Sequence, residues 1–284
     1  MSTPLDRLHA RTDALGASLC LGIDPHPERL PDGVAPGITG VEAFARGIID
    51  AAGAEAVAVK INVAFFEAFG AAGWAALERV RRVVPPQMLC VLDAKRGDIG
   101  STAERYAAGL FGHLDADAVT LSPYLGEDAI EPFLAHPGKM VYVLARTSNP
   151  SASQVQGLDA DGEPVHLRVA RWVAERWTDG RVGLVVGATA PNELERLRRV
   201  LPGPAFLVPG VGAQGGDLAA AARSAGGAWA PGLVSVSRAI AEASTGRDWQ
   251  RAAAAAASEL RGRLREAVLH SASSAAHVAR SGGS

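Results

Sequence analysis

Lysine and cysteine are both scarce in this chain, and each scarcity limits what the chain can be. Of the 28 Lys and Arg residues, only Lys60, Lys95 and Lys139 are lysine. Arginine therefore supplies the ordinary solvated positive charge, and a lysine at a strand end indicates a use for a compact, adjustable ammonium group. The two cysteines, Cys20 and Cys90, fall inside apolar runs without matching histidines. We predict two buried free thiols rather than a disulfide, a reactive nucleophile or a zinc site.

Long apolar runs and a large excess of either charge are also absent. No run approaches the roughly 18 apolar residues of a membrane-spanning helix, and residues 1–11 carry three charges without the apolar stretch of a secretory signal. The net charge of −2 gives no overall electrostatic case for nucleic acid or an anionic membrane. We therefore expect a cytoplasmic protein with neither a nucleic-acid nor a membrane partner.

Short apolar segments recur along the chain and alternate with longer amphipathic stretches. Each apolar segment is continuous rather than alternating, which is typical of parallel strands covered on both faces or closed into a barrel. Eight strand-then-helix units predict an α/β fold of the (β/α)8 TIM barrel type, with a doubly wound open sheet as the alternative. The predicted strands are residues 18–23, 56–61, 88–92, 118–121, 140–144, 182–186, 205–208 and 228–236.

The same alternation of apolar and amphipathic segments predicts one barrel domain over residues 1–270. The Ser-, Ala- and Gly-rich residues 271–284 are expected to form a disordered tail. Residues 149–164 break the rhythm after the fifth strand and indicate either a mobile lid or a tolerated surface insertion. Residues 28–40, rich in Pro and Gly, are expected to run along the rim.

Polar side chains follow nearly every predicted strand at its C-terminal end. In a barrel these ends meet at one mouth, which is where barrel enzymes place their active sites. The strand interiors are apolar, and a purely structural barrel would have less reason to collect polar groups at the mouth. The residues at these ends are Asp24, Lys60, Asp93 with Lys95, Ser122, Ser148, Thr189, Gln214 and Arg238.

The loop after the seventh strand has the composition of a phosphate site. Residues 209–217 read PGVGAQGGD and open a helix, and Arg238 follows the eighth strand. Glycines let backbone N–H groups approach an anion, a helix N-terminus adds partial positive charge, and arginine offers a bidentate fork. The loop lacks both the P-loop ending and the dinucleotide glycine spacing. We favour phosphate binding over a tight turn beside a surface arginine.

Three ionisable side chains form a charged centre at two adjacent strand ends. Asp93 and Lys95 lie two apart on the third strand, so both can face the mouth, and Lys60 ends the neighbouring second strand. Alternating signs offset the desolvation cost, and the shared carboxylate favours the charged form of each lysine. Lys95 is thus expected to stay protonated and to act as a proton donor rather than an imine-forming amine. The alternative is an ion-pair network that only joins strand ends.

The stretch after the third predicted strand carries the pattern Asp-x-Lys-x-x-Asp-Ile-x-x-Thr at Asp93, Lys95, Asp98, Ile99 and Thr102. This pattern resembles the signature of the orotidine 5′-phosphate decarboxylase family. The resemblance covers nearly the whole chain, including the runs LGIDP, VK, PGVGAQ and SR. The length and the runs SPYLG and RTSNP are similar to the longer bacterial branch of the family, whereas the run INVAFF differs from the shorter branch and leaves Asn62 without a role.

The resemblance implies an enzyme that converts orotidine 5′-phosphate to UMP, the last step of de novo pyrimidine synthesis, without a metal or organic cofactor. Lys95 would deliver a proton to C6 of the pyrimidine as carbon dioxide leaves. Asp93 would lie against the substrate carboxylate, where like charge disfavours the bound acid. Lys60 would bridge Asp93 and a ribose hydroxyl, and Asp24 would also bind the ribose.

The resemblance also implies how the rest of the substrate is held. Ser148 would contact the pyrimidine ring, and Pro209 would line the base pocket. Gln214 and Arg238 would bind the 5′-phosphate.

A homodimer with shared active sites is a further implication of the resemblance. Asp98, counted among the catalytic residues, would reach into the active site of the other subunit together with Ile99 and Thr102. The stretch from Asp93 to Thr102 would then be both a catalytic centre and an interface element.

Three other functions stay open. Sugar-phosphate barrels such as hexulose-phosphate synthases and keto-gulonate-phosphate decarboxylases share the Asp-x-Lys-x-x-Asp core but need a divalent metal. The Ile99 and Thr102 continuation, with Gln214 and Arg238, argues against them. A Schiff-base aldolase would use one of the strand-end lysines and would be trapped by borohydride. A non-catalytic phosphate-binding barrel is disfavoured because every expected charged residue is present.

Overall fold

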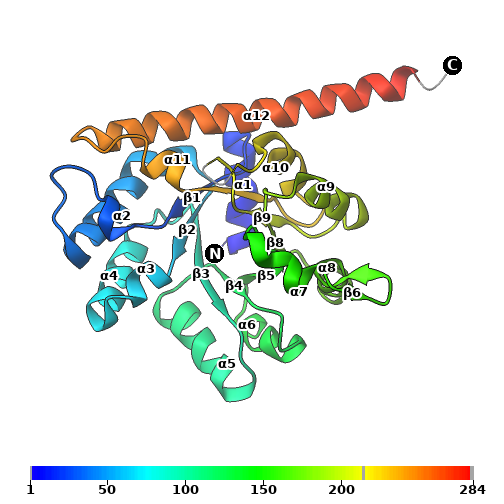
Figure 1. The fold of residues 1–284 in the computed structure, drawn as a ribbon, viewed down its shortest axis with the longest axis horizontal. Helices are drawn as coiled ribbons and strands as arrows, with labels where there is room; N and C mark the ends of the chain where they lie inside the picture. Colours follow the sequence, from blue (N-terminus) through cyan, green and yellow to red (C-terminus); the bar gives the residue numbers. More distant parts are fainter. Residues whose placement is uncertain (1, 213–214, 282–284) are drawn as a thin grey trace.

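Eight parallel strands close into a barrel at the centre of the molecule (Figure 1). The structure is a computed structural model that describes residues 2–212 and 215–281, with side chains as far as residue 270. Each predicted apolar segment supplies one strand, so the barrel is confirmed and the open sheet is wrong. Around the barrel the strands are β1 (Leu19–Ile23), β2 (Ala58–Asn62), β3 (Leu89–Arg96), β4 (Ala118–Leu121), β5 (Met140–Arg146), β8 (Val182–Val186), β9 (Phe206–Val208) and β10 (Leu233–Val236).

Helices surround the barrel, and most follow the amphipathic stretches between the strands. The longer ones are α2 (Gly37–Ala52), α4 (Gly70–Arg82), α5 (Gly100–Ala107), α8 (Val165–Arg176), α9 (Pro191–Val200), α10 (Leu218–Ala225) and α12 (Trp249–Ser281). Short helices are α3 (Ala64–Glu67), α6 (Glu131–Leu134), α7 (Ser153–Gln156) and α11 (Arg238–Ala241). Single turns are η1 (Pro27–Arg29), η2 (Gly53–Glu55), η4 (Glu127–Ala129) and η5 (Pro150–Ala152), and α5 continues into the π-helical η3 (Ala108–His113). Among the described residues, no helix combines the length and apolarity needed to cross a membrane.

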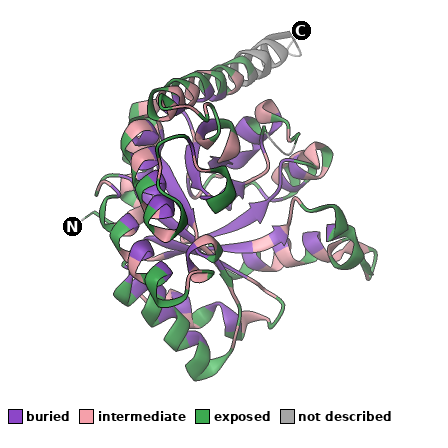
Figure 2. Ribbon diagram, turned by 60° about the vertical axis from the view of Figure 1, so that its left-hand side comes forward, coloured by how far each residue is buried: buried purple, intermediate pink, exposed green. Residues whose placement is uncertain are grey.

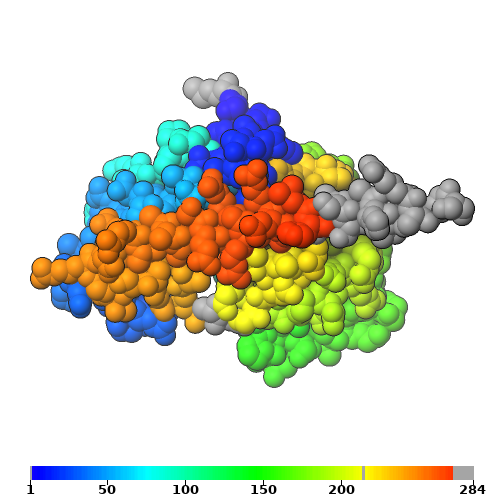
Figure 3. Space-filling view, turned by 90° about the horizontal axis from the view of Figure 1, so that it is seen from above, coloured from blue at the N-terminus to red at the C-terminus, as the bar shows by residue number. Residues whose placement is uncertain are grey.

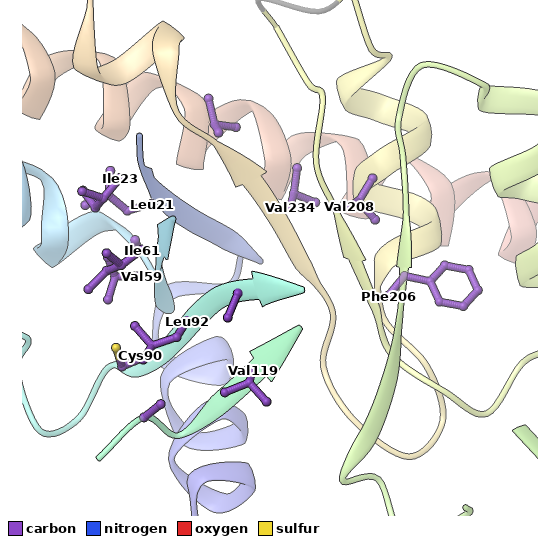
Figure 4. Packing of buried hydrophobic residues seen from close by; sticks show 14 of the residues in the cluster. Leu21, Ile23, Val59, Ile61, Cys90, Leu92, Val119, Phe206, Val208 and Val234 are labelled. Carbon is purple, nitrogen blue, oxygen red and sulfur yellow. The ribbon is translucent and has the colours of Figure 1, made fainter. Parts of the chain in front are cut away.

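Each strand is buried on both faces, which explains why the apolar segments are continuous (Figure 2). Residues such as Leu21, Val59 and Val119 belong to the core between strands and helices (Figure 4). Alternate residues belong to a second core inside the barrel. Cys20 lies in the inner core and Cys90 in the outer one, and both are buried free thiols as predicted.

An N-terminal helix that the sequence patterns had not indicated, α1 (Pro4–Leu15), contributes to the inner core. Thr3 and Asp6 form a capping box: the Asp6 N–H donates to Thr3 Oγ1 at 3.1 Å, and the Thr3 N–H donates to Asp6 Oδ2 at 2.9 Å. The helix ends at Gly16, whose φ of 63° suits glycine. Leu8, fully buried, packs with the residues inside the barrel.

The C-terminal helix α12 is longer than expected. It continues to Ser281, which differs from the prediction of a disordered tail over residues 271–284. Alanine is the strongest helix former, and its abundance in this part of the sequence favours a long helix. Its described part packs on α2 and α10, and Figure 3 shows it, orange to red, crossing this side of the molecule. The last three residues lie outside the described residues.

The segment 149–164 is more regular than its composition suggested. It contains η5, α7 and a two-stranded hairpin of β6 (Asp159–Ala160) and β7 (Glu163–Pro164). Gln156 ties it to the end of β5, because its side chain accepts from the Thr147 N–H at 2.9 Å and donates to Thr147 Oγ1 at 2.7 Å. The two interpretations of this segment, a mobile lid and a tolerated surface insertion, both stay predictions.

Candidate active site

Successive side chains of each strand point alternately into the barrel and away from it. This alternation fills the barrel and also places polar groups at its mouth. Ala58 and Val91 belong to the inner core, and Lys60 and Asp93 follow them by two residues on the same strands. A cavity of about 240 Å³ opens there, and its lining includes both charged residues. Of the predicted site residues, Asp24, Lys95, Ser148, Pro209 and Arg238 also line it.

Asp93 is the hub of the charged centre. Its Oδ2 lies 2.8 Å from Nζ of Lys60, and its Oδ1 lies 2.6 Å from Nζ of Lys95. Asp24 approaches the other side of Lys60, with Oδ1 3.9 Å from Nζ. The Lys60 side chain is 7% exposed and that of Lys95 is 50% exposed. The Lys60 ammonium is therefore held in place by burial at the cavity wall, whereas the Lys95 ammonium has more freedom to move toward a ligand.

Burial and the neighbouring charges shift the pKa values of Lys60 and Asp93 in opposite directions. Burial alone would lower the pKa of Lys60, but the carboxylates of Asp93 and Asp24 outweigh it and hold that pKa above its usual value. Burial would likewise raise the pKa of Asp93, but Lys60 and Lys95 together hold it well below its usual range. The buried pair Lys60 and Asp93 is therefore charged at neutral pH.

The backbone at Lys95 departs from a regular strand. The pairing of β3 with β4 shifts register between Leu92 and Arg96, and Lys95 has a φ of +46°. The sequence spacing predicted a regular strand carrying both side chains on one face. A bulge in fact directs them, and it leaves a residue with a Cβ in the left-handed region, an uncommon arrangement that often marks a functional site.

Thr120 is a site residue that the sequence reasoning missed. It lines the cavity, is 1% exposed and donates from Oγ1 to Asp93 Oδ1 at 2.9 Å. The signal was present: Thr120 is the one polar side chain in β4, two residues after the inward Ala118. Ser235 stands out in β10 by the same criterion and also lines the cavity.

Glycines and one arginine form the opposite wall of the cavity. Gly210 and Gly212 have φ of 95° and 79°, so the loop after β9 takes turns that L side chains rarely adopt. Gly210 and Arg238 line the cavity. Within residues 2–212 and 215–281, Arg238 forms no ion pair with a carboxylate. Gln214, predicted to bind phosphate, lies outside the described residues.

Three predicted site residues do not join the cavity of their own chain. Asp98, Ile99 and Thr102 are absent from its lining, and Ile99 is 52% exposed. Asp98 Oδ1 accepts a hydrogen bond from the Ile99 N–H at 2.8 Å just before α5 begins. Their side chains are therefore presented on the surface beside the mouth.

The described residues contain no carboxylate-rich cluster that could hold a metal ion. No three His, Cys, Asp or Glu side chains gather there closely enough to hold an ion. At the mouth, the lysine ammonium groups occupy both oxygens of Asp93 instead.

Comparison with known proteins places this site in a family. Residues 17–255 match the model described as "Orotidine 5'-phosphate decarboxylase / HUMPS family". The chain belongs to this family. The orotidine 5′-phosphate decarboxylase of Roseiflexus castenholzii is 50% identical over 255 residues, which cover 88% of this chain and 93% of the relative. The resemblance to this family is thereby confirmed.

Solved structures of the family agree with the fold. The orotidine 5′-monophosphate decarboxylase of Leishmania donovani superposes with a TM-score of 0.83 at 38% identity, covering 94% of this chain and 100% of that one. The UMP synthase of the same organism gives a TM-score of 0.83 at 40% identity. This chain spans 57% of that synthase.

Proposed function

We propose that this protein decarboxylates orotidine 5′-phosphate to UMP without a cofactor, the last step of de novo pyrimidine synthesis, and that Lys95 protonates C6. The observation that carries the proposal is the array of Lys60, Asp93 and Lys95 at the mouth of the cavity. Family membership and relatives named as this decarboxylase support the reaction. A cytoplasmic location would suit such an enzyme.

The 5′-phosphate would bind at the wall that Gly210 and Arg238 line, with Gln214 as a further ligand. Ser148 and Pro209, which both line the cavity, would hold the pyrimidine ring. Interactions with the phosphate are remote from the reacting carbon, so their binding energy can organise the site for the transition state.

The chemical step would use the opposite wall. The substrate carboxylate would face Asp93, whose depressed pKa keeps it anionic, and the like charges would favour departure of carbon dioxide. When the bond from C6 to the carboxyl carbon breaks, its electron pair stays on C6. Nζ of Lys95 would then transfer a proton to C6. Lys60, being buried, would keep Asp93 ionised and, with Asp24, contact the ribose.

A shared active site in a homodimer is the remaining part of the proposal. Asp98, Ile99 and Thr102 would complete the cavity of the partner subunit. Their position beside the mouth but outside their own cavity, with half of Ile99 exposed, supports this arrangement.

The metal-dependent sugar-phosphate enzymes are the second candidate, because the matching family model also names the HUMPS group. One assay separates the two. Loss of orotidine 5′-phosphate absorbance on adding protein in EDTA is expected for the decarboxylase. A protein that leaves orotidine 5′-phosphate unchanged and acts on a sugar phosphate only when a divalent cation is present would favour the second candidate.

A further inference from the structure

We propose that Thr120 is a positioning residue that uses one hydroxyl group to fix both the carboxylate of Asp93 and the backbone of Lys95. This inference rests on the proposed function and assigns a role to a residue outside the charged centre. The hydroxyl group would act through these two residues rather than by touching the substrate.

The hydrogen bonds of Thr120 connect the carboxylate of Asp93 with the backbone of Lys95. Its Oγ1 donates to Asp93 Oδ1 at 2.9 Å and accepts from the Lys95 N–H at 3.0 Å. A hydroxyl has one donor and two acceptor positions, so both bonds can be made at once. With 1% exposure, Thr120 has little water to replace either partner. Both bonds therefore hold the hydroxyl in a single orientation.

The bond to the Lys95 N–H supports an unfavourable backbone conformation. On either side of the bulge, Leu92 pairs with Val119 and Arg96 pairs with Leu121. Lys95 lies between these pairs, at a φ of +46°, where its N–H donates to a side chain instead of a neighbouring strand. A residue with a Cβ occupies this region only when its surroundings hold it there. Thr120 is the neighbour that satisfies this N–H.

The bond to Asp93 matters most at the moment of proton transfer. Asp93 Oδ1 accepts from both Thr120 and Nζ of Lys95, whereas Oδ2 accepts from Lys60. If Lys95 turns toward C6, its bond to Oδ1 weakens. Thr120 then remains as the donor on that oxygen, so the carboxylate cannot rotate about its bond to Lys60. Asp93 and Lys95 thus keep their positions relative to the substrate throughout the step.

The test compares variants that separate the hydroxyl from the methyl group of Thr120. Thr120→Val keeps the shape, Thr120→Ser keeps the hydroxyl, and Thr120→Ala differs from the serine variant only by that hydroxyl. Thr12→Val is the matched control, because the Thr12 hydroxyl is buried without a hydrogen-bond partner among the described residues. Thermal unfolding of each variant shows which of them are folded.

We expect the loss of the hydroxyl to lower kcat rather than substrate binding. Thr120→Val and Thr120→Ala should lower kcat by about 100-fold with KM changed less than about threefold, since a small misplacement of reacting groups has this effect. Thr120→Ser and Thr12→Val should stay within about threefold of the wild type in kcat. A serine variant as impaired as the alanine variant, or a valine variant with the wild-type kcat, would overturn the proposal.

A wild-type protein that does not decarboxylate orotidine 5′-phosphate would refute the proposed function instead. The positioning role is then decided by crystal structures of the wild type and Thr120→Val, or of Thr120→Ala if the valine variant does not fold. We expect the variant to show a changed φ at Lys95 or a rotated Asp93 carboxylate. If both match the wild type, the positioning role is wrong.

Discussion

Nζ of Lys60 lies 2.8 Å from Oδ2 of Asp93, and both side chains are largely withdrawn from solvent. Such a pair costs desolvation, and removing one member leaves the other buried and uncompensated. The pKa of Asp93 is held well below its usual range and that of Lys60 above it. The pair is therefore a source of pH-dependent stability as well as a part of the candidate active site.

The first prediction concerns the stability of the Asp93→Asn variant at acid pH. Because the folded pKa of Asp93 is lowered, its stabilising effect is complete above the unfolded value, about 3.9, and is lost as pH falls through the folded value. The difference in unfolding free energy between wild type and Asp93→Asn should therefore shrink below about pH 4. Urea unfolding at several pH values measures it, with Asp13→Asn, an exposed carboxylate, as the control. A difference that stays constant to about pH 2 would contradict the assignment.

The second prediction concerns the proton donor. Lys95→Ala should lower kcat for orotidine 5′-phosphate by about 100- to 10,000-fold, which is the usual contribution of a positioned general acid. Binding of UMP, measured by calorimetry, should stay largely intact because the phosphate wall is unchanged. Lys139→Ala is the matched control: this third lysine pairs with Asp115 at 2.8 Å and does not line the cavity. Substantial turnover by Lys95→Ala would exclude it as the donor.

Much of the fold was predictable because the spacing of apolar residues, and the burial that it reflects, can be recognised in the sequence. Eight continuous apolar segments indicated strands buried on both faces, and the mouth was found from the polar residues that end nearly every strand, although Ser122 and Thr189 do not line the cavity. Lys60, Asp93 and Lys95 were therefore brought together correctly. Ser148, Pro209 and Arg238 share one cavity for the same reason.

Features that depend on tertiary contacts were not predictable in this way. The bulge at Lys95 is set by the register between β3 and β4, which no local pattern records. Thr120 was passed over because a single threonine in an apolar strand is compatible with strand propensity alone. The helix α1 packs through Leu8 inside the barrel, a contact between distant parts of the chain, whereas its capping box is a local signal that was passed over.

The third prediction concerns Arg198, a guanidinium without a carboxylate partner in the described residues. It donates to four backbone carbonyls, three of them at 2.8 Å, and lies 3.8 Å from the centre of the Phe206 ring. Burial lowers its pKa to about 10. Arg198→Lys cannot reproduce the planar fork and should lower the free energy of unfolding by about 2–4 kcal/mol.

The control for this prediction is Arg199→Lys, at the exposed neighbouring position. It should change the free energy of unfolding by less than about 0.5 kcal/mol. Chemical denaturation measures both variants. Equal stability of the two would show that the carbonyl contacts of Arg198 contribute nothing beyond a surface charge.

The fourth prediction tests whether two subunits share each active site. Lys95→Ala and Asp98→Ala should each be inactive as pure proteins, the first because it lacks the donor and the second because it cannot complete the partner's cavity. In a mixed dimer, one of the two cavities would carry both defects and the other neither. Mixing the two proteins under conditions that exchange subunits should therefore restore up to about a quarter of the wild-type turnover, since random exchange makes about half the dimers mixed and only one of their two sites intact.

The control is a mixture of Lys95→Ala with Asp93→Ala. These defects lie in the same cavity of each chain, so both sites of a mixed dimer would be defective. Subunit exchange is verified with two affinity tags, and activity is followed as exchange proceeds. Recovery in the first mixture and none in the second requires Asp98 to act across the interface, because a residue that served its own chain would leave a defect in every site of both mixtures.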